Sequence, residues 1–329
     1  MNWQGKSVLV TGAGGFLGSH LVERLVELGA RVRALVRYNS RNDWGLLELL
    51  PPPVTSEIEV FLGDLTDPFG TARAVQGCRV IFHLAALIAI PYSYQAPAHY
   101  VATNIGGTLN LLEAARQQGV ERVVHTSTSE TYGTAQYTPI DEAHPLRGQS
   151  PYAASKIGAD KLAESYHLSF GLPVVTLRPF NTYGPRQSSR AIIPTIISQG
   201  LSGPVIRLGR LTPLRDLTFV SDMVAGFIQA AASPAAVGEV INLGSGRAIT
   251  IGDLAHRIIG LLEGGKEITL EEVRLRPDAS EVMELICNYG KAKQMLGWQP
   301  QVDLEEGLTR TIAFIRDHLE RYKPALYTV

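Results

Sequence analysis

Tyr152 and Lys156 are the residues of this chain whose types and spacing most directly suggest chemistry. Residues four apart on a helix share a face, so a helix through this segment would point the Tyr phenol and the Lys ammonium the same way. A free phenol has a pKa near ~10 and is a poor base at neutral pH. A neighbouring cation favours the phenolate, so we expect Lys156 to lower the pKa of Tyr152 until it can take a proton from an alcohol. Taken alone, the pair has an ordinary alternative: an aromatic residue on a core face beside a solvated Lys.

A glycine-rich turn lies near the start of the chain. Residues 7–10 are a short apolar run that predicts a buried strand, and apolar residues at helical spacing follow over residues 20–28. Strand, glycine turn and helix form the context of a dinucleotide site, where glycines let backbone N–H groups approach a pyrophosphate. The spacing is G-x-x-G-x-x-G, and a glycine turn without a ligand is the alternative. The predicted cofactor contacts here are Gly12, Gly15, Phe16, Leu17 and Gly18.

Polar residues follow a second predicted strand, at residues 122–125. Thr128, Ser129 and Glu130 come soon after this strand, and the C-terminal ends of parallel strands are where open α/β sheets bind ligands. Hydroxyls beside a carboxylate could serve a substrate there. The alternative is a turn built by the Ser and Thr hydroxyls, with a solvated Glu.

Composition excludes several classes of partner. The chain has 329 residues, of which 45% are hydrophobic and 19% charged, and a net charge of −1 gives no reason to expect nucleic acid or an anionic membrane surface. No apolar run approaches the ~20 residues of a spanning helix. The first strand begins by residue 7, so we expect no signal peptide and a cytoplasmic protein. Cys78 and Cys287 are expected to be buried small hydrophobes, and no metal site is expected.

Strand and helix patterns alternate through the first half of the chain. We expect further strands at 32–36, 58–62, 80–83 and 174–177, helices at 69–76, 98–118 and 151–169, and a loop over 38–56. This alternation predicts an α/β protein with a Rossmann-type doubly wound parallel sheet. Residues 1–180 would form the dinucleotide-binding domain, with segments near 209–245 returning to it. Residues 181–329 would mainly form a smaller α/β substrate domain.

With these motifs in order, nearly the whole chain resembles the extended short-chain dehydrogenase/reductase family that acts on nucleotide sugars. The segment 128–130 is similar to the Thr-Ser-Glu triad of GDP-mannose 4,6-dehydratases. The segments 150–165 and 186–195 are similar to GDP-N-acetylglucosamine 4,6-dehydratases of legionaminic acid synthesis. UDP-glucuronate decarboxylases also carry Thr-Ser-Glu. The other matching motifs are Gly63-Asp64-Leu65, His83-Leu84-Ala85-Ala86, Thr103-Asn104, Arg178-Pro179-Phe180-Asn181, Tyr183-Gly184-Pro185-Arg186, Arg215-Asp216 and Arg276-Pro277.

The resemblance implies a nucleotide-sugar 4,6-dehydratase. Tyr152 would take the proton of the sugar C4 hydroxyl while a hydride leaves C4, Lys156 would hold the nicotinamide ribose, and Thr128 would hydrogen-bond the C4 oxygen. Glu130 would remove the proton at C5. Ser129 stands where related enzymes have an acid, so Glu130 could serve as both base and acid. The alternatives are a decarboxylase or epimerase of the same family, or a non-catalytic NAD(P)-binding sensor.

The cofactor contacts expected outside the glycine turn are Arg37, Asp64, Leu65 and Ala85. Asp64 and Leu65 would meet the adenine, although a helix N-cap near Thr66 or Asp67 is an equal alternative. The strand predicted at 32–36 is followed by Arg37 and Tyr38, with no acidic residue for a ribose diol. Arg37, Ser40 and Arg41 could instead hold a 2′-phosphate. Both NAD and NADP therefore remain open.

Four polar residues are candidates for binding the pyrophosphate of the sugar nucleotide: Asn181, Arg186, Arg215 and Arg276. Guanidinium groups match phosphate oxygens, whereas a surface ion pair is the alternative for any one of them. The predicted helices 98–118 and 151–169 carry apolar residues on more than one face. By resemblance to the family, this favours a homodimer packed as a four-helix bundle, although ordinary core helices would look similar.

Overall fold

The computed structural model describes residues 1–262, 264–275 and 277–326 of the chain. Within these residues, seven parallel strands form the main sheet in the order β3-β2-β1-β4-β5-β6-β10. This order is that of doubly wound dinucleotide-binding sheets, so the predicted fold class is confirmed. The strands are β1 (Ser7–Thr11), β2 (Arg31–Arg37), β3 (Ile58–Gly63), β4 (Val80–His83), β5 (Arg122–Thr126), β6 (Val174–Pro179) and β10 (Val240–Leu243).

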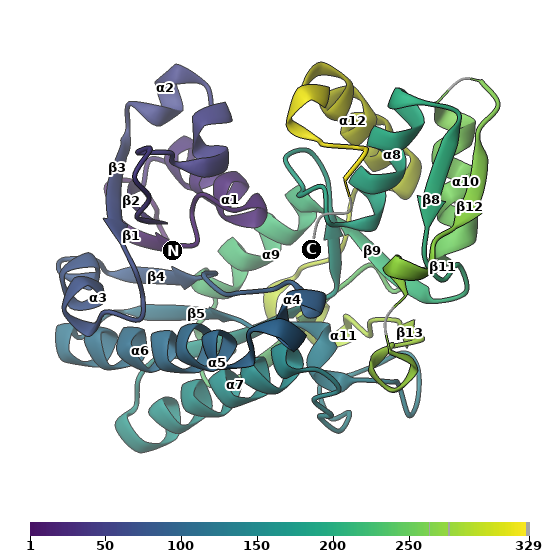
Figure 1. The fold of residues 1–329 in the computed structure, drawn as a ribbon. Coiled ribbons are helices and arrows are strands. Elements are labelled where there is room, and N and C mark those ends of the chain that lie inside the picture. Colours follow the sequence, from purple (N-terminus) through teal and green to yellow (C-terminus); the bar gives the residue numbers. More distant parts are fainter. Residues whose placement is uncertain (263, 276, 327–329) are drawn as a thin grey trace.

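Helices cover both faces of the main sheet (Figure 1). Helices α1 (Phe16–Glu27) and α9 (Val220–Ala232) pack on one face, and α3 (Pro68–Val75), α6 (Gly107–Gln118) and α7 (Pro151–Phe170) pack on the other. Side chains alternate between the faces of a strand. Val8 and Val10 accordingly join the core beneath α1, whereas Leu9 joins the core beneath α6.

The ends of α7 follow directly from the sequence. The Ser150 hydroxyl accepts a hydrogen bond from the Ala153 N–H at 3.1 Å, and Pro151 fills the first helical position, where no N–H is needed. The helix ends at Gly171, whose φ of 66° lies in the left-handed region. The start of this helix therefore fixes the position of Tyr152, its second residue.

Two predicted segments differ in detail from the structure. The helix predicted at 98–118 consists of α5 (Pro97–Tyr100), a π-helical turn η2 (Val101–Gly106) and α6. The loop predicted at 38–56 contains the short helices η1 (Gly45–Leu49) and α2 (Pro52–Thr55), because Pro52 and Pro53 suit a first helical turn as well as a loop. The structure also contains α4 (Ile90–Gln95), a single short helix that has no periodic pattern long enough to predict it.

The later part of the chain builds a second, smaller layer beside the main sheet (Figure 1). Strand β9 (Leu214–Phe219) pairs with β7 (Asn181–Tyr183), β11 (Ala248–Thr250) and β13 (Glu284–Leu285), while β8 (Val205–Leu208) pairs with β12 (Glu267–Leu270). The accompanying helices are α8 (Ile192–Ser202), α10 (Ile251–Leu261), α11 (Gly290–Leu296) and α12 (Leu304–Asp317). Short 3₁₀ turns lie at η3 (Ser129–Tyr132), η4 (Pro234–Ala236), η5 (Glu272–Arg274), η6 (Asp278–Ser280) and η7 (Leu319–Arg321). None of the helices in the described ranges has the length and apolarity to span a bilayer.

Candidate active site

A cavity of about 1030 Å³ lies where the C-terminal ends of the main strands face the second layer. In open α/β sheets this edge is where ligands bind. All nine predicted cofactor contacts outside α7 line the cavity: Gly12, Gly15, Phe16, Leu17, Gly18, Arg37, Asp64, Leu65 and Ala85. Thr128, Ser129, Glu130 and Tyr152 line it as well. Residues from the start and the middle of the sequence therefore share one space.

The glycine turn between β1 and α1 is shaped by close backbone contacts. A Cβ on Gly18 would lie 2.2 Å from the Gly12 carbonyl oxygen, and Gly12 itself has a φ of +69° and would place a Cβ 2.8 Å from the Ala85 N–H nitrogen. Helix α1 begins at its Gly15 N-cap without a side-chain cap and has no acidic residue in its first turn. An uncapped helix N-terminus with no competing carboxylate suits a pyrophosphate, so the residues present fit a dinucleotide.

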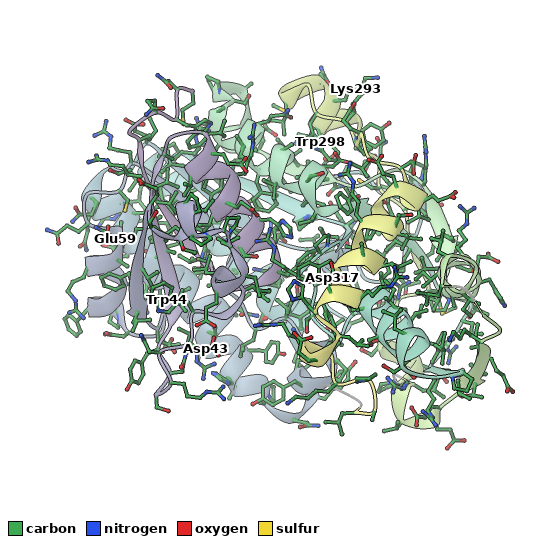
Figure 2. All side chains as sticks on the ribbon, turned by 90° about the horizontal axis from the view of Figure 1, so that it is seen from above. Asp43, Trp44, Glu59, Lys293, Trp298 and Asp317 are labelled. Atoms are coloured by element: carbon green, nitrogen blue, oxygen red, sulfur yellow. The ribbon has the colours of Figure 1, made fainter. Side chains whose placement is uncertain are left out.

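The loop after β2 closes against this glycine turn. A Cβ on Gly14 would lie 2.6 Å from the Trp44 carbonyl oxygen, and the Leu46 N–H donates to the Gly14 carbonyl at 2.9 Å. Asp43 and Trp44 are labelled in this loop in Figure 2. The Asn39 side chain orders it by donating to the Asp43 carbonyl and accepting from the Arg41 and Asp43 N–H groups. Arg37, Asn39 and Arg41 consequently line the cavity beside the glycines.

Asp64 lies at the end of β3, close to Arg37. Its Oδ1 accepts hydrogen bonds from the Thr66 N–H and hydroxyl, at 2.9 and 2.8 Å. Burial raises the pKa of Asp64, but the Thr66 hydrogen bonds and the charge of Arg37 outweigh burial and leave it below its usual value. The N-cap of α3 is Asp67, which accepts from the Phe69 and Gly70 N–H groups. Asp64 is therefore an ionised cavity residue and not the helix cap.

Tyr152 is buried, with 7% of its surface exposed, and its phenol lies near Thr128 and Glu130. Burial raises the pKa of Tyr152 above its ordinary value, hydrogen bonding with Thr128 opposes the rise, and the charge of Glu130 adds to it. From the sequence we expected Lys156 to lower the pKa of Tyr152. The predicted direction was wrong, because the pKa of Tyr152 is raised. Removing the phenolate from water raises the pKa of Tyr152 by more than the hydrogen bond with Thr128 lowers it.

Lys156 lies one helical turn further along α7 and does not line the cavity. Its ammonium donates to the Thr126 carbonyl oxygen at 2.6 Å, at the end of β5. Burial lowers the pKa of Lys156 to about 8, and the charge of Asp160 opposes the decrease. Lys156 is 3% exposed, and its hydrogen bond to the Thr126 carbonyl holds α7 to β5.

Ser129 and Glu130 form the start of the 3₁₀ turn η3, directly after β5. The Thr128 hydroxyl accepts from the Glu130 N–H at 3.2 Å and so starts this turn. Ser129 is buried, whereas the Glu130 side chain is half-buried. The turn thus presents a carboxylate to the same space as the Tyr152 phenol, as the electrostatic effect of Glu130 on Tyr152 indicates.

The predicted phosphate contacts do not all line the cavity. Asn181 and Arg215 line the cavity, and Arg215 also donates to Glu281 at 3.2 Å. Arg186 does not line it: its guanidinium pairs with Glu23 and His20 on α1, which corrects the expectation that it faces the substrate. Arg276 falls outside the described residues.

Four further arginines line the part of the cavity formed by the second layer: Arg190, Arg207, Arg210 and Arg274. Arg210 pairs with Asp278 and Arg274 with Glu271. The charge of Arg190 lowers the pKa of Tyr100 against the larger, opposite effect of burial, so Arg190 lies near the ring that packs edge-on against Tyr152. Sequence reasoning missed all four. Only Arg190 carried a signal, because it falls inside the family-matching segment 186–195.

A family model described as GDP-mannose 4,6 dehydratase matches residues 9–311 of the chain. The chain belongs to this family of nucleotide-sugar dehydratases and epimerases. It is 35% identical to a UDP-glucose 4-epimerase of Mycolicibacterium smegmatis over 316 residues, covering 94% of this chain and 98% of the relative. It is 33% identical to a dTDP-glucose 4,6-dehydratase of Streptomyces antibioticus over 326 residues, covering 97% of this chain and 95% of the relative.

A solved structure gives the same result. The dTDP-glucose 4,6-dehydratase of Streptomyces venezuelae, crystallised with NAD bound, superposes with a TM-score of 0.86 at 30% identity, covering 97% of this chain and all of that chain (100%). The chain is therefore an enzyme of the NAD-dependent dehydratase and epimerase family. Because the relatives include both kinds of enzyme, the choice of reaction depends on the residues of the site.

Proposed function

We propose that this protein is a nucleotide-sugar 4,6-dehydratase that converts a GDP- or UDP-linked hexose or N-acetylhexosamine into its 4-keto-6-deoxy product. The observation that carries the proposal is the placement of the Glu130 carboxylate in the same cavity as the Tyr152 phenol. An epimerase needs only to oxidise C4 and reduce it again. A dehydratase must also remove the proton at C5 and release water from C6, which requires an additional acid and base.

Tyr152 is the group that takes the proton from the C4 hydroxyl, and the Thr128 hydroxyl hydrogen-bonds the same oxygen. A bound nicotinamide would accept the hydride from C4 and return it at C6. The cation of Lys156 stabilises the charge that develops on the phenol and would lie near the nicotinamide ribose. Burial raises the pKa of Tyr152 above its ordinary value, so a positive charge nearby would favour its deprotonation.

Glu130 acts after C4 has become a ketone. A ketone acidifies the neighbouring C5 proton, and a carboxylate on the turn after β5 is the available base. Ser129 is a much weaker acid than a carboxyl group, so Glu130, once protonated, is also the group that gives a proton to the departing C6 hydroxyl. One carboxyl therefore serves both steps. As the hydride enters at C6, C5 regains a proton through Glu130 from solvent, and Tyr152 returns to solvent the proton that it took from the C4 hydroxyl, so that the protons balance.

The diphosphate of the substrate would lie among the arginines of the second layer. Arg190, Arg207 and Arg215 line the cavity there together with Asn181. Guanidinium groups bind phosphate oxygens through pairs of N–H donors, and several close together suit the charge of a diphosphate.

The cofactor is NAD or NADP, and the residues after β2 favour NADP. Arg37 ends this strand, the backbone N–H of Arg41 donates to the Asn39 side chain, and both arginines line the cavity. Where NAD binds, an acidic residue usually accepts from the ribose diol, whereas arginine accommodates a 2′-phosphate.

We also propose a homodimer that packs through α5, η2, α6 and α7. These helices expose Val101, Leu109 and Leu168, with 53%, 41% and 75% of their surfaces accessible. Apolar residues on the outer face of helices that already pack on a core suit a four-helix interface. Analytical ultracentrifugation tests the proposed homodimer. We expect dimers for the wild-type protein and monomers for Leu109→Asp, whereas a monomeric wild-type protein would refute the homodimer.

Mass spectrometry of product mixtures tests the reaction. The purified enzyme is given GDP-mannose, GDP-N-acetylglucosamine, UDP-N-acetylglucosamine and UDP-glucuronate in separate reactions, each with NAD or NADP. A dehydratase lowers the substrate mass by about 18, a decarboxylase lowers it by about 44, and an epimerase leaves it unchanged. Mass loss of about 18 supports the proposal. Turnover without that loss refutes it, and no turnover of any sugar nucleotide would favour the sensor alternative.

A further inference from the structure

A buried polar cluster lies directly behind the catalytic residues, between β5, β6 and α7. At its centre is Asp160, which is only 5% exposed. Its carboxylate accepts hydrogen bonds from the Ser127 hydroxyl at 2.7 Å and from His125 Nε2 at 3.1 Å, and it forms an ion pair with Arg178 at 3.1 Å. The reaction described above uses none of these four groups directly. Burying a charge is costly unless it is paired and hydrogen-bonded, and the Asp160 carboxylate is both.

Asp160 is linked by position to Lys156. The two residues are four apart on α7 and therefore share a face of that helix. Burial disfavours the charged form of the Lys156 ammonium, and the negative charge of Asp160 offsets part of this effect. The cluster thus supplies the anion that a buried lysine requires.

The other groups around Lys156 cannot replace that anion. His83 on β4 and His125 on β5 are fully buried, and burial lowers the pKa of each, so both are neutral at physiological pH. Arg178 on β6 is a cation and is already bound to Asp160 and to the Tyr132 hydroxyl. Tyr152, on the same helix, keeps its proton in the chain alone because burial raises its pKa.

We propose that Asp160 is a positioning residue that acts through Lys156. Its carboxylate ties α7 to β5 and β6, and it holds the Lys156 ammonium in its charged form at the Thr126 carbonyl. The proposal rests on the role given to Lys156 in the proposed function. The structural part of it, the charge on Lys156, can be measured without any substrate.

The experiment follows the titration of Lys156 by NMR of the full-length protein carrying ¹³C-labelled lysine side chains, with Lys156→Met to assign the signal. The wild-type midpoint is expected near 8. Asp160→Asn is expected to shift it downward by about one pH unit, a tenfold loss of proton affinity. Asp160→Glu retains the charge and is expected to restore the midpoint. Ser127→Ala is the matched control, since it removes one hydrogen bond from the same carboxylate but leaves the charge in place.

An unchanged Lys156 midpoint in folded Asp160→Asn would overturn the proposal, as would an equal shift in Ser127→Ala. If Asp160→Asn alone does not fold, the double variant Asp160→Asn with Arg178→Gln removes both buried charges together and allows the same measurement. In turnover assays, the alkaline limb of the pH profile is expected to move with the midpoint. A shifted midpoint in a protein that turns over no nucleotide sugar would refute the proposed function and leave the role of Asp160 standing.

Discussion

Replacing Glu130 with Gln separates the two halves of the proposed reaction. Gln has nearly the same shape, and the N–H of residue 130 still donates to the Thr128 hydroxyl, so the turn after β5 is expected to keep its conformation. The Tyr152 phenol and Lys156 are untouched, so C4 oxidation remains possible. The amide cannot take the C5 proton, and the carboxyl acid that releases water is lost as well.

The expected loss of turnover is roughly 10²- to 10⁴-fold, the usual contribution of a positioned acid or base. This corresponds to about 2.7–5.4 kcal/mol of transition-state stabilisation. The assay measures the 4-keto-6-deoxy product by mass spectrometry and, in the same samples, the near-ultraviolet absorbance of reduced nicotinamide. We expect little product and an accumulated reduced cofactor.

Ser129→Ala is the matched control, because Ser129 is the neighbouring residue on the same turn and lines the same cavity. If Glu130 supplies both proton transfers, removing the Ser129 hydroxyl changes turnover by less than about tenfold. Wild-type turnover in Glu130→Gln would refute the assignment. A loss in Ser129→Ala as large as that in Glu130→Gln would show that the hydroxyl shares the acid role.

Three other predictions concern the cofactor end of the cavity and the charge behind it. Gly18→Ala places a Cβ against the Gly12 carbonyl, so it is expected to lower the free energy of unfolding by about 1–3 kcal/mol and to weaken dinucleotide binding. A thermal-shift titration measures both effects. Gly203→Ala is the control and should cause neither effect, because its Cβ would meet nothing within 4 Å. Lys156 is a cation only below its pKa of about 8, so dinucleotide affinity is expected to fall as pH rises through 8. The affinity of Lys156→Met should not change with pH in this range. A wild-type affinity that rises with pH would contradict the prediction. Arg41→Ala should weaken NADP binding by about tenfold and leave NAD binding unchanged in calorimetry, and equal losses for both cofactors would exclude a 2′-phosphate contact.

The main features of the fold could be predicted because they depend on local patterns. The β1 run, the glycine turn and the α1 helix follow one another in sequence, and the sheet order follows from repeated strand–helix alternation. Short helices such as α4 and the η1–α2 segment were missed because one helical turn carries no period. The division of the chain at residue 180 stays a prediction. Strand β10 lies in the main sheet and belongs to the segments near 209–245 that were expected to return to the first domain.

The site was predictable where its residues follow strand ends and less so where tertiary contacts decide. Thr128, Glu130 and Tyr152 belong to local motifs, and the cavity brings them together. Arg186 looked like a phosphate contact, but its partners on α1 are far away in sequence. The effect of burial on the pKa of Tyr152 could not be predicted from the sequence either, because residues from several elements together exclude water from a side chain.

A 4,6-dehydratase moves a hydride from C4 of the sugar to C6 of the same molecule. A nucleotide sugar carrying deuterium at C4 tests this directly, with the label in the product located by NMR. We predict a 4-keto-6-deoxy sugar whose deuterium is at C6. Deuterium found again at C4, on a sugar of unchanged mass, would contradict the dehydratase assignment and identify an epimerase.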